Sequence, residues 1–188
     1  MRARSQTRAA FTVIELLIVM AIIIVLAGLI LATSGYVQKK GARSRAETEI
    51  AAISAALESY KADNGVYPQS TATNALDPTA VPATNNYNYL DAGHTLYQLL
   101  SGDPDGAPGT TGDDTKNYIA ALLRAGSLAT PSGEIPYLKD PFGNAYGYST
   151  MKANNSTAHG YNPTFDLWST VGTTGASASD QAQWIKNW

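Results

Sequence analysis

An uninterrupted apolar run near the N terminus constrains this chain more than any other feature. Residues 16–32 carry no polar side chain, and extending the run back to Phe11 adds only Thr12 and Glu15 as polar members. At about 1.5 Å of rise per residue, a helix over this extended run would be about 33 Å long, close to the thickness of a bilayer's hydrocarbon layer. The run therefore predicts a membrane-spanning helix rather than the core helix of a soluble domain.

Two ordinary kinds of N-terminal segment fit this run in part. A secretory signal peptide begins with basic residues and ends at a small-x-small site such as Ala32-Thr33-Ser34, but its apolar stretch is usually about 7–15 residues long. A plain signal anchor is the second kind. The flanking charges do not settle the orientation, because the basic residues beyond the run outnumber those before it. The four beyond it are Lys39, Lys40, Arg43 and Arg45, and the three before it are Arg2, Arg4 and Arg8.

A third interpretation depends on Glu15. A charged side chain at the centre of a spanning helix costs about 2.5–3.5 kcal/mol and usually has a specific partner. The residues around Glu15, RAA-FTVIELL, resemble the processing site of type IV prepilins and type II secretion pseudopilins. Two positions depart from that family. Ala10 stands where the family usually has Gly, and Ala32 stands where many members have Pro.

The resemblance has specific implications for the N terminus. It implies that a prepilin peptidase cleaves between Ala10 and Phe11 and methylates the new amine of Phe11. It also implies that Glu15, the fifth residue after the cut, pairs with the terminal amine of a neighbouring subunit during assembly. An unpaired carboxylate in lipid is costly, so this pairing would favour one axial stagger between subunits.

Beyond the membrane, an apolar stripe predicts that the same helix continues. Its positions recur at helical spacings of four, three, four and three: Ala46, Ile50, Ile53, Leu57 and Tyr60. The opposite side is predicted to be polar, with i,i+4 pairs Arg43–Glu47 and Arg45–Glu49. Gly65 and the following Pro68 predict the helix end. A coiled-coil stalk is disfavoured, because the stripe lasts only about two heptads.

The remaining chain is predicted to form short helices and a small sheet. Helical turns are expected at 94–100 and 115–125, a loop at 71–88, a turn at 140–143, and strands near 146–148, 165–169 and 183–187. Four segments resemble the major pseudopilins of type II secretion: ALESYKADNGVYP, YLKDPFGNAYGYS, FDLWSTVG and a closing I-x-N-W. The resemblance implies a pilin-like α+β fold, in which a long N-terminal helix, membrane-spanning in its first half, packs on a small antiparallel C-terminal sheet.

The pilin-like interpretation predicts three parts in the chain. Residues 1–10 form a basic leader peptide, residues 11–65 the long helix, and residues 66–188 an extracytoplasmic domain with a loop-rich insertion at about 69–135.

The resemblance also raises the question of calcium. Major pseudopilins hold the ion in the loop after the FDL-type strand, which implies the backbone oxygen of Leu167 and the side chains of Ser169 and Asp180 as ligands here. Calcium takes six to eight oxygens and gains most from carboxylates, yet Asp180 is the only carboxylate in this loop, and Thr174 stands where an Asp is expected. We therefore expect a hydrogen-bonded turn, with calcium an optional ligand and no cofactor required. An alternative calcium loop at Asp103-x-Asp105 fails the spacing template.

Composition argues against enzymatic and nucleic-acid-binding functions. The chain has no Cys, only two His, and a formal net charge of -2 with no basic field for nucleic acid. His94 and His159 stand in no metal-ligand spacing, and no nucleotide-binding or nucleophile motif occurs. The sequence thus favours a structural protein over an enzyme.

The function predicted is a structural subunit of a pseudopilus filament that supports type II protein secretion. It implies an inner-membrane, single-pass protein with a periplasmic domain that forms a homo-oligomeric filament. Its partners would be the prepilin peptidase, the inner-membrane assembly platform, minor pseudopilins and membrane lipid, with no nucleic acid. One alternative is a type IV pilin for adhesion, motility or DNA uptake. An alternative of another class is a secreted or membrane-anchored binding module.

Overall fold

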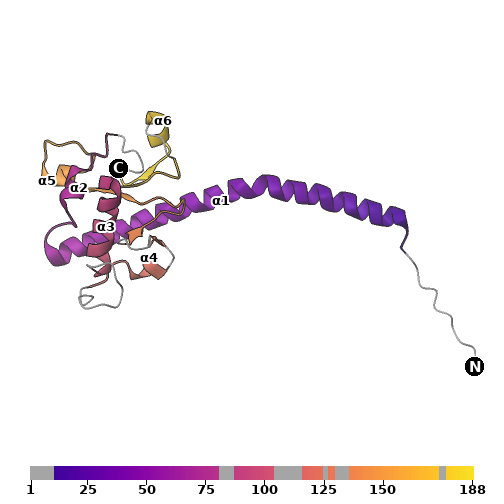
Figure 1. The fold of residues 1–188 in the computed structure, drawn as a ribbon, viewed down its shortest axis with the longest axis horizontal. Helices are drawn as coiled ribbons and strands as arrows, with labels where there is room; N and C mark the ends of the chain where they lie inside the picture. Colours follow the sequence, from indigo (N-terminus) through magenta and orange to yellow (C-terminus); the bar gives the residue numbers. More distant parts are fainter. Residues whose placement is uncertain (1–10, 81–86, 104–115, 125–126, 130–135, 174–176) are drawn as a thin grey trace, which may run out of the picture. The chain divides into compact units, whose positions relative to one another are not determined.

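The structure is a computed structural model, which describes residues 11–80, 87–103, 116–124, 127–129, 136–173 and 177–188 (Figure 1). The chain divides into two compact units, Met1–Gly41 and Ala42–Trp188. Helix α1, Val13–Asn64, contributes its first part to one unit and its second part to the other. A small antiparallel sheet and short helices complete the second unit. This arrangement confirms the predicted α+β class, with a long N-terminal helix and a small sheet.

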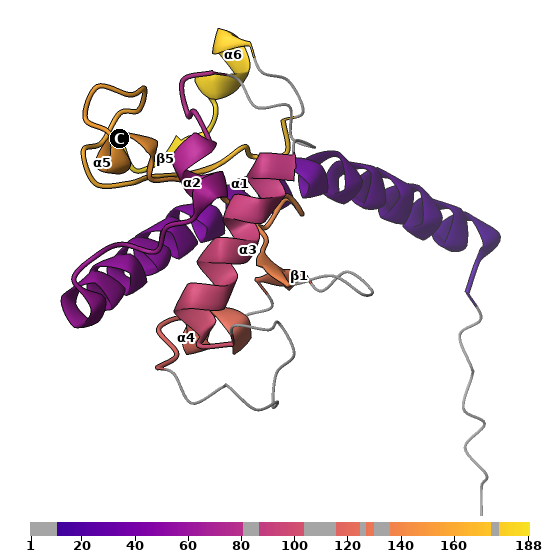
Figure 2. The same cartoon turned by 60° about the vertical axis from the view of Figure 1, so that its left-hand side comes forward.

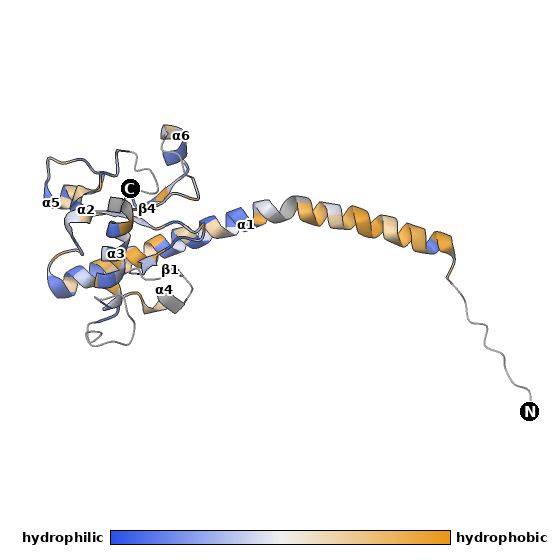
Figure 3. Ribbon diagram, in the orientation of Figure 1, coloured by the Kyte–Doolittle hydropathy of each residue, from blue (hydrophilic) through white to orange (hydrophobic). Residues whose placement is uncertain are grey.

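In the first unit, the apolar part of α1 is exposed along its whole length. The large apolar side chains from Phe11 to Leu31 each expose between 52% and 86% of their surface. Figure 3 shows this part of α1 as a nearly continuous apolar stretch. The helix is long and apolar enough to cross a membrane, as the sequence predicts.

In the second unit, the predicted stripe of α1 forms one side of the core. Ala46, Ile50, Ile53 and Leu57 are buried, and Tyr60 packs against them at the edge. The same cluster takes in side chains from α3, from the sheet and from the residue just before β3, among them Leu96, Leu100, Tyr146, Tyr148 and Leu167. The helix ends where the sequence predicts. Gly65 has φ +79°, and its N–H donates to the Lys61 carbonyl at 2.7 Å, as in a left-handed helix cap.

The C-terminal sheet has three antiparallel strands in the order β3-β4-β5. These are β3 (Gly147–Ser149), β4 (Asp166–Ser169) and β5 (Ile185–Lys186). Gly147 pairs with Trp168, and Ser169 pairs with Ile185. All four residues of β4 are buried, since it is the central strand. The three strands lie near the positions predicted from the sequence. The turn at 140–143 is closed by the Gly143 N–H, which donates to the Asp140 carbonyl at 3.0 Å.

The segment between α1 and this sheet is more ordered than the sequence indicates. It contains α2 (Thr71–Ala75), α3 (Tyr87–Ser101), α4 (Ala120–Arg124), and a two-stranded sheet of β1 (Leu128–Ala129) and β2 (Tyr137–Leu138). Helix α3 packs against α2 and against strands β2 and β3 (Figure 2). Two four-residue helices, α5 (Met151–Asn154) and α6 (Ala178–Gln181), lie in the loops that connect the larger sheet.

Two local predictions in this segment are wrong in part. The loop predicted at 71–88 begins with α2, because the Ser70 side chain and Thr73 form a reciprocal capping box that starts a helix. It ends inside α3, which starts seven residues before the predicted helix at 94–100. The helix predicted at 115–125 is shorter in the structure. Residues 116–119 are not helical, and Thr115 and Ala125 lie outside the described residues.

Candidate functional site

The N-terminal site consists of Glu15 and the residues around the start of α1. Phe11 precedes the helix and exposes 86% of its surface, whereas Ala10 lies outside the described residues. The backbone N–H and the hydroxyl of Thr12 both donate to Glu15 Oε2, each at 2.8 Å. The Glu15 N–H in turn lies 3.4 Å from the Thr12 hydroxyl oxygen. Thr12 and Glu15 therefore form a capping box at the first turn of α1.

This capping role of Glu15 was missed in the sequence, although the pattern T-x-x-E before an apolar run signals it. The cap satisfies helix N–H groups that otherwise have no acceptor, and it places a carboxylate next to the positive end of the helix dipole. It also leaves room for a second partner. Oε2 accepts both bonds from Thr12, and Oε1 has no hydrogen-bond donor among the described residues. Glu15 thus keeps a free acceptor, and it stands among exposed apolar side chains.

The loop after β4 contains the residues predicted to bind calcium, and each has a protein partner. The Ser169 hydroxyl donates to Asp140 Oδ2 at 2.5 Å. The backbone oxygen of Leu167 accepts the Asn187 N–H at 3.1 Å. Asp180 lies in α6, where its Oδ2 accepts the hydroxyl of Ser177 at 2.6 Å as part of a capping box.

The described residues of this loop supply one carboxylate, that of Asp180. Calcium needs six to eight oxygens and several carboxylates, but here the one carboxylate of the loop caps its own helix. Thr174 lies outside the described residues. Within the described part of the chain, no group of three or more His, Asp or Glu is placed to hold a metal. The expected hydrogen-bonded turn is present, because the Thr173 N–H donates to the Thr170 carbonyl at 2.9 Å.

Asp140 is the residue of this region that sequence reasoning did not single out. Its side chain is 2% exposed and accepts the Phe142 and Asn144 N–H groups at 3.0 and 2.9 Å, besides the Ser169 hydroxyl. Burial raises the pKa of the Asp140 carboxyl, although these hydrogen bonds act to lower it. Asp140 therefore holds the turn at 140–143 against the end of β4. Its place as the first residue of an Asp-Pro-x-Gly turn was the available signal.

Glu49 corrects the prediction of a polar outer face on α1. The ion pair between Arg43 and Glu47 is exposed as predicted, but Glu49 is only 5% exposed. Arg45 Nε donates to its carboxylate at 2.7 Å, and the hydroxyls of Ser127 and Tyr146 donate to it at 2.8 and 2.6 Å. Burial and the bond to Glu49 raise the pKa of the Tyr146 phenol. The spacing signals the correction, because Glu49 follows Ala46 by three and therefore shares the buried side of the helix.

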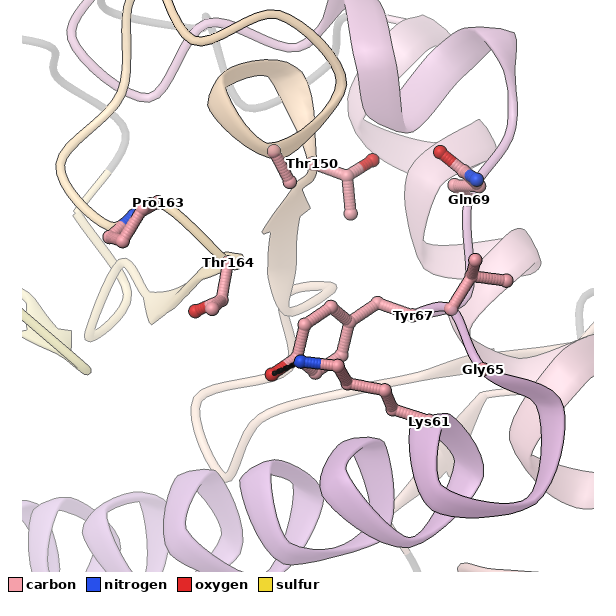
Figure 4. Close-up of a pocket in the computed structure, with 9 residues that line it drawn as sticks. Lys61, Gly65, Tyr67, Gln69, Thr150, Pro163 and Thr164 are labelled. Atoms are coloured by element: carbon pink, nitrogen blue, oxygen red, sulfur yellow. Dashed lines mark hydrogen bonds between the residues drawn. The ribbon is translucent and has the colours of Figure 1, made fainter.

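A pocket of about 260 Å³ opens beside the end of α1 and is shown in Figure 4. Residues from the last turn of α1, from the segment 65–69 and from the loop at 163–164 line it, together with Thr150 and Ala153. Lys61 Nζ donates to the Tyr67 hydroxyl at 3.3 Å, and that hydroxyl donates to Glu58. None of the lining residues is His, Asp or Glu.

The two histidines, and Ser101 at the end of α3, contact other residues of the fold. His159 Nδ1 lies 2.6 Å from Asp77 Oδ2 on the surface. His94 packs beside the Tyr137 ring, with centroids 5.9 Å apart. Ser101 Oγ accepts the Asp103 N–H at 3.1 Å.

Comparison with known proteins decides the family. Type II secretion system core protein G of Escherichia coli K12 is 34% identical over 142 residues, which cover 63% of this chain and 95% of the relative. The chain belongs to this family of major pseudopilins. Core protein G of Pectobacterium carotovorum is 34% identical over 130 residues, covering 57% of this chain and 83% of the relative. Core protein G of Vibrio cholerae is 33% identical over 107 residues, covering 56% of this chain and 69% of the relative. Neither a family model nor a solved structure matches significantly.

The major pseudopilin family accounts for less than two thirds of this chain. Because nearly the whole Escherichia coli relative aligns with 63% of the residues, more than a third of the chain has no counterpart in it. The membership confirms the resemblance first carried by the N-terminal segment and by the four segments further along the chain.

Proposed function

We propose that this chain is the structural subunit of a pseudopilus filament that supports type II protein secretion. Its relatives are named as core proteins of that secretion system, and this supports the secretion role over a type IV pilus used for adhesion, motility or DNA uptake. The same relatives support a structural role over an enzymatic one or that of a separate binding module.

The observation that carries the proposal is the apolar first part of α1. Its side chains are exposed from Phe11 to Leu31, and such a surface requires either lipid or other apolar helices as cover. A single-pass subunit has such a cover both in the membrane and in the filament. Lipid covers the helix while the protein is in the inner membrane, and helices of neighbouring subunits cover it in the filament. In this proposal the second unit is periplasmic.

The proposal includes processing at the N terminus. A prepilin peptidase removes residues 1–10 by cutting between Ala10 and Phe11 and then methylates the amine of Phe11. The exposed position of Phe11 just before α1 is compatible with access by such an enzyme. Intact-mass measurement of protein extracted from membranes tests this step. We expect a chain that starts at Phe11 with one added methyl group. A chain that starts after Ala32-Thr33-Ser34 would instead show that the run is a secretory signal peptide, and the filament role would be refuted.

Glu15 is proposed to pair with the terminal amine of a neighbouring subunit during assembly. Its free Oε1 is the acceptor for that contact, while Oε2 stays bonded to Thr12. Glu15→Gln is a sharp test, because Gln also serves in a capping box but carries no charge. We expect Glu15→Gln to insert and to be processed, yet to lose most of the cross-linked ladder of filament subunits in cells. The matched control is Glu47→Gln, which removes an exposed charge further along the same helix.

A second variant separates assembly from capping. Thr12→Val removes the hydroxyl that donates to Glu15 but keeps the backbone N–H and the charge. We expect this variant to retain the ladder. Equal loss in Thr12→Val and Glu15→Gln would mean that Glu15 acts only as a helix cap. An unchanged ladder in Glu15→Gln would mean that its charge has no part in assembly.

A further inference from the structure

The segment just beyond the apolar run carries charges that the fold does not use. Between Glu15 and Glu47 the sequence has no acidic residue, but it has Lys39, Lys40, Arg43 and Arg45. The two arginines are engaged inside the second unit. Arg43 lies 3.4 Å from Glu47 and donates to the Gln183 carbonyl at 2.8 Å, and Arg45 donates to the buried Glu49. Lys39 and Lys40 are exposed, and neither has a hydrogen-bond or carboxylate partner among the described residues.

The position of these lysines along α1 places them at the membrane surface. Lys39 follows Ala32, the last residue of the apolar run, by seven positions, or about 10 Å of helix. Helical side chains lean toward the N terminus of the helix, and a lysine stem extends along apolar surface with its ammonium in water. Both ammonium groups therefore reach back into the headgroup layer, which is about 5–8 Å thick on each side of the hydrocarbon.

A tyrosine on the same helix face fits the same layer. Tyr36 exposes 73% of its surface and precedes Lys39 and Lys40 by three and four positions, so the three side chains share one face. It lies four residues, or about 6 Å, beyond Ala32. Tyrosine is enriched at this depth because its ring is apolar and its hydroxyl is polar. An aromatic anchor beside two uncompensated cations is complementary to a phospholipid surface of negative charge.

From this arrangement we propose that Tyr36, Lys39 and Lys40 form a binding surface for anionic phospholipid headgroups. The surface lies on the side of the membrane that holds the second unit, and it fixes the depth at which α1 sits. It selects phosphatidylglycerol-like lipids over zwitterionic ones, because each lysine ammonium close to an anionic surface is attracted by the negative charge. Salt screens this attraction and weakens it. The inference needs only that α1 spans the membrane, so it stands or falls separately from the role in secretion.

The test measures lipid selectivity directly. The full chain is reconstituted in phosphatidylcholine vesicles that contain traces of spin-labelled phosphatidylglycerol or phosphatidylcholine. Electron paramagnetic resonance then gives the fraction of each labelled lipid immobilised by the protein. We expect the wild-type chain to prefer phosphatidylglycerol several-fold, with an upper bound of about fivefold per lysine. Lys39→Gln/Lys40→Gln should lose most of this preference.

Two control variants make the outcome specific. Lys39→Arg/Lys40→Arg keeps both charges and should keep the preference. Lys61→Gln removes a lysine that already contacts Tyr67 in the second unit, and it should leave the preference unchanged. Tryptophan fluorescence of Trp168, Trp184 and Trp188 verifies that the second unit is folded in every variant. An equal phosphatidylglycerol preference in the wild type and in Lys39→Gln/Lys40→Gln would overturn the proposal.

A salt comparison separates a lipid surface from a pocket for free phosphate. Inorganic phosphate and chloride, compared at equal ionic strength, should reduce the preference by the same factor, because both act by screening. A clearly larger reduction by phosphate would show that the lysines bind the free anion, and the lipid assignment would be wrong.

Discussion

Buried carboxylates in the second unit are stabilised in two different ways. Glu49 accepts hydrogen bonds from a guanidinium and from two hydroxyls, so its charge has a cationic partner. Asp140 accepts two backbone N–H groups and the Ser169 hydroxyl, and no salt bridge to a cation is found for it among the described residues. These two environments lead to different predictions. Removing the paired charge of Glu49 leaves its hydrogen-bond donors without an acceptor. Neutralising the unpaired charge of Asp140 removes the free-energy cost of keeping a charge away from water.

Glu49→Ala should destabilise the second unit strongly. It leaves the buried Tyr146 hydroxyl without its acceptor and removes the partner of Arg45, a loss worth about 3 kcal/mol in buried sites. The control Glu47→Ala removes an exposed carboxylate from the same helix and should cost less than about 0.5 kcal/mol. Urea unfolding of the detergent-solubilised chain, followed by tryptophan fluorescence, measures both. Similar midpoints for the two variants would show that the contacts of Glu49 contribute little.

Asp140→Asn should change how stability depends on pH. Burial raises the pKa of Asp140 above its ordinary value of 3.8 in the folded chain. The unfolded chain therefore loses this proton at lower pH than the native state, so the contribution of Asp140 to stability falls as pH rises from about 4 through the folded pKa. Asn carries no charge and can still accept the two N–H groups. We expect the free energy of unfolding of Asp140→Asn, relative to the wild type, to increase between pH 3 and pH 7.

Asp166 supplies the internal reference for that measurement. Burial raises its pKa as well, although the Tyr161 and Asn162 N–H groups donate to its carboxylate and act to lower the pKa. Asp166 stays in the Asp140→Asn chain, so its contribution to the pH dependence is the same in the wild type and in the variant, and the difference between the two reports Asp140. A pH dependence identical to that of the wild type would show that Asp140 does not contribute to it.

At the scale of elements, one glycine of strand β3 makes room for a tryptophan of the central strand β4. Gly147 pairs with Trp168, and the indole ring of Trp168 occupies the space beside the Gly147 Cα. A Cβ at this position would lie 2.1 Å from Trp168 Cε2, which is far inside any normal contact. Trp168 is fully buried and stacks 6.2 Å from Trp184, so it has little freedom to move away. The close approach of β3 to β4 thus requires glycine at 147.

Gly147→Ala should therefore destabilise the sheet, with a cost of about 3 kcal/mol from overpacking. Gly93→Ala is the matched control in α3, where an added Cβ would meet Tyr137 and Ala145 at 3.6 and 3.7 Å. Those are ordinary contacts, and Ala favours the helix by about 1 kcal/mol over Gly. We expect Gly93→Ala to be neutral or slightly stabilising in the same urea experiment. Tolerance of Gly147→Ala would mean that Trp168 can leave its position at little cost.

At the scale of the whole molecule, the two units differ in the exposure of their apolar side chains. The first unit exposes those of its apolar run, whereas the second buries its apolar stripe inside its own core. The second unit has no Cys in its sequence, and its described residues show no group of acidic or histidine side chains suited to a metal. Core packing and buried hydrogen bonds are therefore the interactions that we identify as holding it together.

Calcium should accordingly have little effect on the second unit. If the ion bound only the native state, a hundredfold excess over its dissociation constant would add about 2.7 kcal/mol to the free energy of unfolding. That would raise the melting temperature by several degrees in a domain of this size. We expect a difference below about two degrees between millimolar calcium and chelator. A clear upward shift that Asp180→Ala abolishes would show that Ser169, Asp180 and backbone oxygens suffice to bind the ion.

Local patterns in the sequence were enough to predict the long helix and its end. The apolar run, the stripe from Ala46 to Tyr60 and the stop at Gly65 depend on helical periodicity and on backbone freedom, which act between near neighbours. The first two strands of the larger sheet were likewise predictable from alternation. Similarity to known pseudopilins at the N-terminal segment and the C-terminal segments was enough to predict the family.

Tertiary structure alone decided which partners the buried polar residues have. Glu49 meets Ser127 and Tyr146, and Ser169 meets Asp140, across long separations in the chain. No periodicity relates residues that far apart, because their contact depends on how α1, the turn at 140–143 and β4 pack together. The calcium ligands predicted by resemblance depend on the same packing. In the structure the Ser169 hydroxyl donates to Asp140, while Asp180 accepts from Ser177 and the Leu167 carbonyl accepts from Asn187. The physical reason is that a polar group in a folded chain pairs with the nearest complementary donor or acceptor.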